Sequence, residues 1–186
     1  RDWAECKHKV TDDTPYGGGD GMVMKVEPVA AALSELREKR PASRVLLMSP
    51  QGQTFQKADA ERFSQEAGLV FVCGRYEGFD ERIRSLVDEE ISLGDFVLTG
   101  GELAAATILD ATARLLPGVL GAAGSAQGDS FSDGLLEYPQ YTRPAEFKGV
   151  RVPEVLASGN HQLIDNWRRR EELRRRLEGR PELLGS

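Results

Sequence analysis

Two short apolar segments with a helical pattern between them constrain the fold more than any other feature of this sequence. Residues 45–48 and Leu69–Cys73 are unbroken apolar runs bounded by turn-forming residues. Such runs are typical of strands buried on both faces of a parallel sheet. Residues 58–66, between the runs, are rich in helix formers, and a helical spacing of apolar residues also follows Pro28. This alternation predicts an α/β fold built on a parallel sheet.

A third strand and helix are expected further along the chain. Residues 96–98 are apolar and lead through a pair of glycines into residues 102–116, a segment rich in Ala, Leu and Ile. Glu102 at its start suits the positive end of a helix dipole, and Pro117 ends the helical pattern. We therefore predict a strand at 96–98 and a helix over 102–116.

The composition changes after Leu120. Residues 121–134 are mainly Gly, Ala, Ser, Asp and Gln, which is typical of a flexible or ligand-ordered linker. Residues 160–177 beyond it have a strong helical pattern. We predict a first domain over residues 1–120, a linker over 121–135 and a small helical domain over 136–186.

Charge is unevenly distributed between these parts. The net charge is −6, yet residues 140–186 hold ten Lys or Arg against seven Asp or Glu. An acidic chain of this kind is not a general nucleic-acid coat protein, but a basic face on an acidic body can still contact a polyanion.

The cysteines and the apolar content predict the compartment. Cys6 and Cys73 are the only cysteines, so we expect no disulfide framework and a reducing compartment, the cytoplasm. No apolar stretch approaches the length of about 18 residues that a membrane helix needs, and no secretion signal opens the chain. The two His and two Cys also lack the spacing of a zinc site.

Glycine-containing loops follow the predicted strands. They occupy residues 49–52, 74–78, 92–95 and 98–102. Ligands of open α/β sheets bind outside the carboxyl ends of the strands, where glycine loops offer backbone N–H and C=O groups. Each loop alone is equally consistent with an ordinary turn, but together they predict a ligand site.

Residues 14–22 form another glycine-rich segment, with four glycines in five positions. This composition allows close backbone approach and left-handed conformations, although a plain tight turn explains it equally well. Neither a G-x-G-x-x-G loop after a strand nor a P-loop motif is present, so a nucleotide-like ligand has to bind in another way.

Several charged residues have structural as well as functional explanations. Arg114 could pair with Asp110 one helical turn earlier, and Asp129 could cap a helix or form an Asx turn. Arginine clusters at 168–170 and 174–176 are most simply an exposed helix face that pairs with neighbouring glutamates, namely Glu171, Glu172 and Glu178.

A series of longer motifs carries a family resemblance. They run in order through the chain as PYGGG (15–19), SPQG (49–52), CGRYEGFDER (73–82), SLGDFVLTGGE (92–102), LPGVL (116–120), DSF (129–131), YTRP (141–144) and SGNH (158–161). In these motifs the chain resembles the bacterial tRNA (guanine-N1)-methyltransferases. It departs from them at Asp20, where Pro is usual, at Phe96, where Tyr is common, and at Gly128, where an acid is usual. The family's first strand and helix and part of its C-terminal tail have no counterpart in this sequence.

The resemblance implies a SPOUT-type α/β fold: a parallel sheet with a deep trefoil knot, followed by a small helical C-terminal domain. It also implies that S-adenosylmethionine binds in the knot, held largely by backbone groups, with Glu77 as the charged contact. The cofactor-binding residues implied by matching motifs are Pro50, Gln51, Gly52, Gly74, Tyr76, Glu77, Ser92, Leu93, Gly94, Phe96, Leu98, Gly100 and Gly101.

The reaction implied by the resemblance is methyl transfer to N1 of the guanosine just 3′ of the anticodon in tRNA. Asp129 would be the base that removes the N1 proton, and Arg114 would hydrogen-bond the guanine O6. The family also uses magnesium, whose ligands the sequence does not identify. The implied assembly is a homodimer with an active site shared between chains.

We expect the basic C-terminal segment to bind tRNA phosphates, through Arg143, Arg168, Arg169 and Arg170 in particular. Three alternatives remain open. The first is a SPOUT enzyme that methylates a ribose 2′-hydroxyl, which would not need a base beside an O6-binding arginine. The second is a non-catalytic RNA-binding module, and the third is an α/β ligand-binding domain that does not use S-adenosylmethionine.

Overall fold

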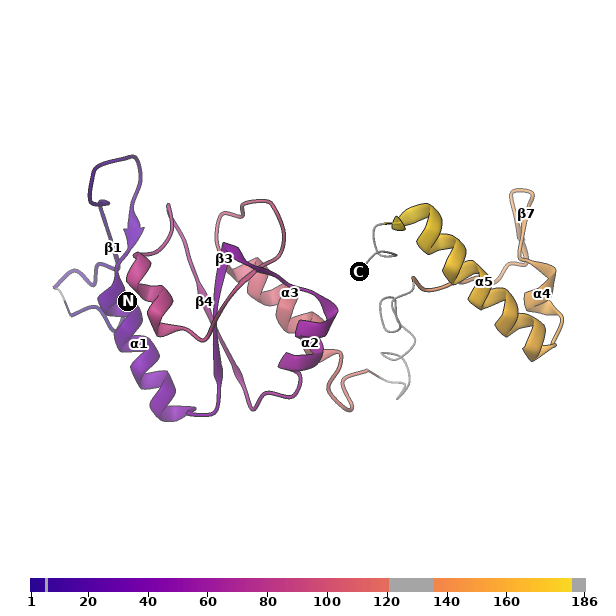
Figure 1. Ribbon diagram of the computed structural model, residues 1–186, viewed down its shortest axis with the longest axis horizontal. Helices are drawn as coiled ribbons and strands as arrows, with labels where there is room; N and C mark the ends of the chain where they lie inside the picture. Colours follow the sequence, from indigo (N-terminus) through magenta and orange to yellow (C-terminus); the bar gives the residue numbers. More distant parts are fainter. Residues whose placement is uncertain (6, 121–135, 182–186) are drawn as a thin grey trace. The chain divides into compact units, whose positions relative to one another are not determined.

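The computed structural model describes residues 1–5, 7–120 and 136–181 (Figure 1). The chain divides into two compact units, Arg1–Val119 and Leu120–Ser186, which we describe separately. The predicted linker lies outside the described residues. In chain order the elements are β1 (Asp12–Asp13), β2 (Val23–Met24), α1 (Val26–Lys39), β3 (Arg44–Thr54), α2 (Lys57–Phe63), β4 (Leu69–Cys73), the 3-10 helix η1 (Glu81–Leu86), β5 (Glu89–Ser92), α3 (Glu102–Ala113), β6 (Glu146–Phe147), β7 (Val150–Arg151), α4 (Glu154–Ala157) and α5 (His161–Gly179).

The first unit is built on a three-stranded parallel sheet in the order β4-β3-β5, which confirms the α/β prediction. Leu46 on the central strand pairs with Phe71 on one side and Glu89 on the other. The apolar run that opens β3 is buried throughout, as expected for a strand covered on both faces.

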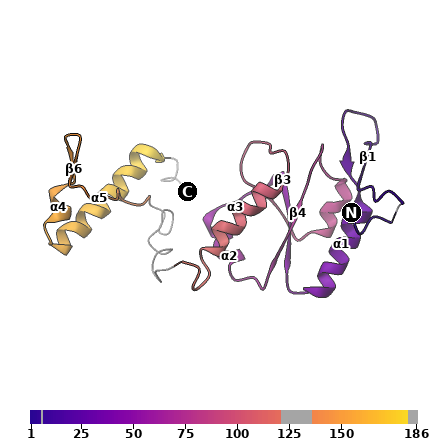
Figure 2. The same ribbon diagram turned by 180° about the vertical axis from the view of Figure 1, so that it is seen from behind.

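Helices cover both faces of this sheet, as Figures 1 and 2 show from opposite sides. Because side chains alternate along a strand, Leu46 and Met48 pack against Phe63 of α2 and against the start of α3. Val45 and Leu47 face the other way and pack against α1 and η1, where Leu33 and Ile83 complete a second core cluster. Two apolar layers therefore fix the sheet between its helices.

The third strand is not where the sequence predicted it. Strand β5 is Glu89–Ser92, whereas residues 96–98 lie in a loop in which Val97 is 84% exposed. The charges of β5 hide it from an apolar-run search. Glu89 pairs with Arg62 at 2.5 Å and with Arg44, and these arginines lower the pKa of its carboxyl group. The strand buries Ile91, while Glu89 pairs with arginines that lie 45 and 27 residues away in the chain.

Two helices end earlier than predicted, for the same reason. Helix α3 ends at Ala113 and not at residue 116, because the amides of Leu115 and Leu116 bond to the third residue back instead of the fourth, as in Leu116 N–H to Ala113 O (3.0 Å). Pro117 then disfavours helical backbone in the residue before it. Helix α2 ends at Phe63, with similar three-residue turns after it.

Within residues 136–181, the second unit contains the predicted helical segment, as α4 and α5, together with the β6-β7 hairpin. The hairpin turns at Lys148 and Gly149, whose positive φ angles of 50° and 82° suit a two-residue turn. Helix α5 confirms the predicted 160–177 segment, and the Asn160 side chain caps it by accepting the Leu163 N–H at 3.2 Å. Trp167 is the buried apolar anchor of α5. Across the described parts of the chain, no helix is both long and apolar enough to span a membrane.

Candidate active site

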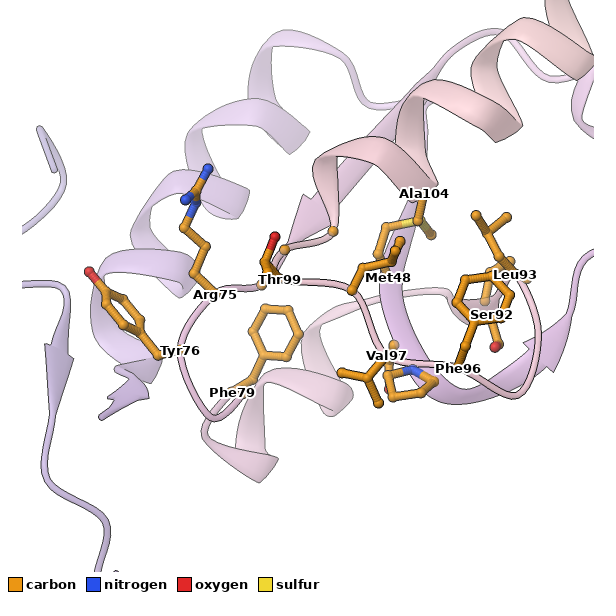
Figure 3. A pocket seen from close by; sticks show the side chains of 18 of the residues that line it. Met48, Arg75, Tyr76, Phe79, Ser92, Leu93, Phe96, Val97, Thr99 and Ala104 are labelled. Carbon is orange, nitrogen blue, oxygen red and sulfur yellow. The ribbon is translucent and has the colours of Figure 1, made fainter. Parts of the chain in front are cut away.

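A pocket of about 170 Å³ lies at the carboxyl ends of the three parallel strands (Figure 3). Because parallel strands end at the same edge of a sheet, the loops after β3, β4 and β5 meet there. Ten of the residues implied as cofactor contacts line this pocket: Pro50, Gly74, Tyr76, Glu77, Ser92, Leu93, Phe96, Leu98, Gly100 and Gly101. The structure thus brings together residues from three separate motifs.

Close backbone packing joins two of these loops. The Gly101 N–H donates to the Gly74 carbonyl oxygen at 3.0 Å, which ties the start of α3 to the end of β4. A Cβ at Gly101 would lie 2.9 Å from Cys73 Cα and 3.0 Å from Met48 Cβ, too close for any side chain. Glycine is therefore required for α3 to begin at the pocket floor.

Three residues implied as cofactor contacts do not line the pocket. The Gln51 side chain accepts a hydrogen bond from the Arg84 guanidinium. A Cβ at Gly52 would lie 2.4 Å from the Glu90 carbonyl carbon, so this glycine lets β3 pass close to β5. The Gly94 N–H donates to Ser92 Oγ at 3.1 Å, which shapes the turn after β5. These three residues support the loops that form the pocket.

Sequence reasoning missed several lining residues, among them Met48, Arg75, Phe79, Val97 and Thr99. Figure 3 shows Met48 and Phe79 beside the pocket. Met48 is the last residue of the apolar run in β3, and the others belong to the longer motifs at 73–82 and 92–102. Their position next to implied contacts was the available signal.

The pocket has an apolar body and a polar rim. Arg75 pairs with Glu102 at 2.8 Å on the exposed side of the loop. The backbone N–H of Glu102 itself and the Arg75 guanidinium both hold the pKa of the Glu102 carboxyl below its ordinary value. Burial raises the pKa of the Cys73 thiol, which disfavours a nucleophilic thiolate. The site suits a ligand that has both apolar and polar parts.

Magnesium finds no evident site in what the structure describes. Within residues 1–5, 7–120 and 136–181, no group of three or more His, Cys, Asp or Glu side chains could hold a metal ion. The described residues therefore identify no ligands for the magnesium ion that the resemblance implies.

The structure does not test the roles of the two implied catalytic residues. Arg114 lies at the C-terminal end of α3, where its backbone N–H donates to the Asp110 carbonyl oxygen at 3.2 Å. It is not among the residues that line the pocket. Asp129 lies outside the described residues. Both roles stay predictions.

The arginines of α5 have partners within the second unit. Arg168 lies 4.8 Å above the Tyr138 ring and 3.5 Å from Asp165, and Arg169 pairs with Glu172 at 3.2 Å. Arg170 is more open, with 72% of its side chain exposed. Glu171 and Glu178 both pair with Arg174, so the structural explanation for these charges holds in part. Contact with RNA stays a prediction, as it does for the exposed Arg143.

Comparison with known proteins identifies the family. Residues 1–186 match the profile of the family described as tRNA (Guanine-1)-methyltransferase TrmD. A tRNA (guanine-N(1)-)-methyltransferase of Syntrophotalea carbinolica is 67% identical over 184 residues, which cover 99% of this chain and 74% of that relative. Proteins of the same name from a Geobacter species and from Lactiplantibacillus plantarum are 63% and 58% identical, over 99% of this chain and 74% and 75% of those relatives. The chain therefore belongs to the tRNA (guanine-1)-methyltransferase TrmD family.

Proposed function

We propose that this chain is a tRNA (guanine-N1)-methyltransferase that uses S-adenosylmethionine and acts on the guanosine just 3′ of the anticodon. The observation that carries the proposal is the family match over all 186 residues. The pocket supports it, because it is built from three of the motifs on which the resemblance rests.

The pocket residues fit S-adenosylmethionine, which when bound supplies the methyl group. Gly74, Gly100 and Gly101 line the pocket with backbone and no side chain, which suits a ligand held without a dinucleotide or P-loop motif. Leu98 and Phe96 give the apolar surface that an adenine ring requires. The exposed carboxylate of Glu77 is suited to the positively charged end of the ligand.

Proton removal is the chemical task left to the chain. Neutral guanine carries a proton on N1, so a base has to accept it as negative charge spreads toward O6. Asp129 takes this proton. Its ordinary pKa is near 3.9, so the product anion needs stabilisation, and Arg114 provides it by donating a hydrogen bond to O6. Positioning of N1 in line with the methyl group supplies a further large part of the rate.

The knot and the shared site belong to the same proposal. The family match supports the knot, because the family implies a SPOUT fold. We expect a homodimer in which Asp129 of one protomer serves the pocket of its partner. Sedimentation should show a dimer at micromolar concentration. A mixed dimer of Asp129→Ala and Gly101→Trp chains should regain one working site, and a monomer or a dead mixed dimer would contradict sharing.

One experiment separates this function from its alternatives. The chain is titrated calorimetrically with S-adenosylmethionine and then incubated with it and a tRNA transcript, whose nucleosides are analysed by mass spectrometry. We expect binding heat and 1-methylguanosine, which should disappear when the target guanosine is replaced by adenosine. A 2′-O-methylated nucleoside would favour the ribose-methylating alternative. Binding without methylation would favour a non-catalytic module. The absence of binding heat would exclude S-adenosylmethionine as the ligand of this pocket.

A further inference from the structure

The chain segment at β2 lies behind one wall of the pocket. Glu77 N–H donates to the Met22 carbonyl oxygen at 3.0 Å, and Met24 N–H donates to the Gly78 carbonyl oxygen at 2.9 Å. Asp80 N–H donates a hydrogen bond to the Met24 carbonyl oxygen at 2.9 Å. Neither methionine lines the pocket itself, so this segment holds the Glu77 loop from outside.

The loop held in this way has an unusual backbone. Tyr76 has φ 61° and Gly78 has φ 129°, so residues with positive φ flank Glu77 on both sides. A residue other than glycine persists in this region only where the surrounding structure holds it there. The hydrogen bonds to Met22 and Met24 supply that restraint.

Gly21 leaves the space that the Glu77 side chain occupies. A Cβ built on Gly21 would lie 2.5 Å from Glu77 Cγ and 2.7 Å from its Oε1, closer than real side-chain contacts. The sequence allows two interpretations of residues 14–22: a plain turn, or a segment that another part of the chain approaches closely. At Gly21 the approach is to Glu77, whereas a Cβ on Gly17 or Gly18 would have no neighbour within 4 Å.

We propose that Gly21 is a positioning residue for cofactor binding, because the space beside its backbone sets the direction in which Glu77 meets the pocket. This inference rests on the proposed function. It extends the site beyond the residues that line the pocket, to a glycine that acts through Glu77. In this segment Gly21 has a role beyond forming a turn, whereas Gly17 and Gly18 are explained by the turn alone.

Gly21→Ala tests the inference, with Gly18→Ala as its matched control. Gly18 has φ +77° and Gly21 has φ +80°, so alanine brings the same backbone strain at both positions, and only at Gly21 does the methyl group meet Glu77. We expect Gly21→Ala to raise the calorimetric dissociation constant for S-adenosylmethionine about tenfold or more, as for directly coupled residues. Gly18→Ala should leave it within about twofold.

Thermal unfolding without ligand measures the same contact independently. Gly21→Ala should lower the unfolding temperature more than Gly18→Ala does, and the excess should vanish when both are placed in a Glu77→Ala chain. If Gly21→Ala fails to fold, its double variant with Glu77→Ala should fold as the double variant of Gly18→Ala with Glu77→Ala does, because only the backbone strain is then left. Equal effects of the two glycine changes, or an excess that persists without the Glu77 side chain, would overturn the inference. A parent chain that binds no S-adenosylmethionine would remove the proposed function, and this inference with it.

Discussion

In the first unit the pocket is bounded by backbone and apolar side chains on short loops, whereas the second unit carries long charged side chains along α5. Gly101 packs against Cys73 with no space to spare, but Arg170 is 72% exposed. Rigid close packing recognises shape and is insensitive to salt, while exposed charges recognise phosphates and are screened by salt. Mutations and changes in ionic strength should therefore affect the binding functions of the two units separately.

The largest expected effect is on chemistry alone. Asp129→Asn keeps the shape of the side chain but cannot accept the N1 proton, so methylation should fall below detection in single-turnover assays. S-adenosylmethionine and tRNA dissociation constants should stay within about threefold, because neither binding function depends on a base. Near-normal turnover of this variant would remove Asp129 from its role.

Arg114→Ala comes next. Loss of one donor to a developing oxyanion typically lowers turnover by about 10²–10³-fold. Arg114→Lys keeps the positive charge but not the planar donor geometry, so it should recover part of that loss. The measurement is the single-turnover rate at saturating cofactor and tRNA. If both variants turn over as the parent does, Arg114 does not contact O6.

Replacing Arg168, Arg169 and Arg170 together with Ala should act on tRNA alone. If all three contact phosphates, the log–log salt slope of tRNA binding flattens by roughly 2 to 3 units, at about 0.7–0.9 per charge. The matched control, Ala at the exposed Lys7, Lys9 and Arg40, removes the same charge from the first unit and should leave the slope unchanged. An unchanged slope in the α5 variant would assign these arginines to their pairs with Asp165 and Glu172.

The sequence predicted the apolar strands and the glycine loops because both follow from local patterns. Strand β5 escaped this reasoning because Glu89 is compensated by Arg44 and Arg62, which lie far away in the chain. Pairing of that kind has no local signal. Gln51 and Gly52, which the resemblance implied as cofactor contacts, instead meet Arg84 of η1 and Glu90 of β5, contacts that no local pattern announces. Gly21 belongs to a motif that the sequence shows, but its contact with Glu77 appears only in the folded chain.

The smallest effect separates a fixed charge from a solvated one. Glu89, 19% exposed, is held by Arg62 and Arg44, and hydrogen bonds from Arg62 chiefly lower the pKa of its carboxyl group in the folded chain. As pH falls through about 4 to 5, the unfolded chain takes up this proton first, so the pair stabilises above that range and the stabilisation is lost as pH falls toward the folded pKa. Glu89→Gln should lower the urea midpoint at pH 7 and flatten its decline below pH 5. Glu178, whose side chain is 65% exposed, pairs with Arg174. Glu178→Gln breaks this pair and should change the urea midpoint little, because such pairs contribute about 0.3–0.5 kcal/mol. Parallel curves for Glu89→Gln and the parent chain would show that this charge is as solvated as those of α5.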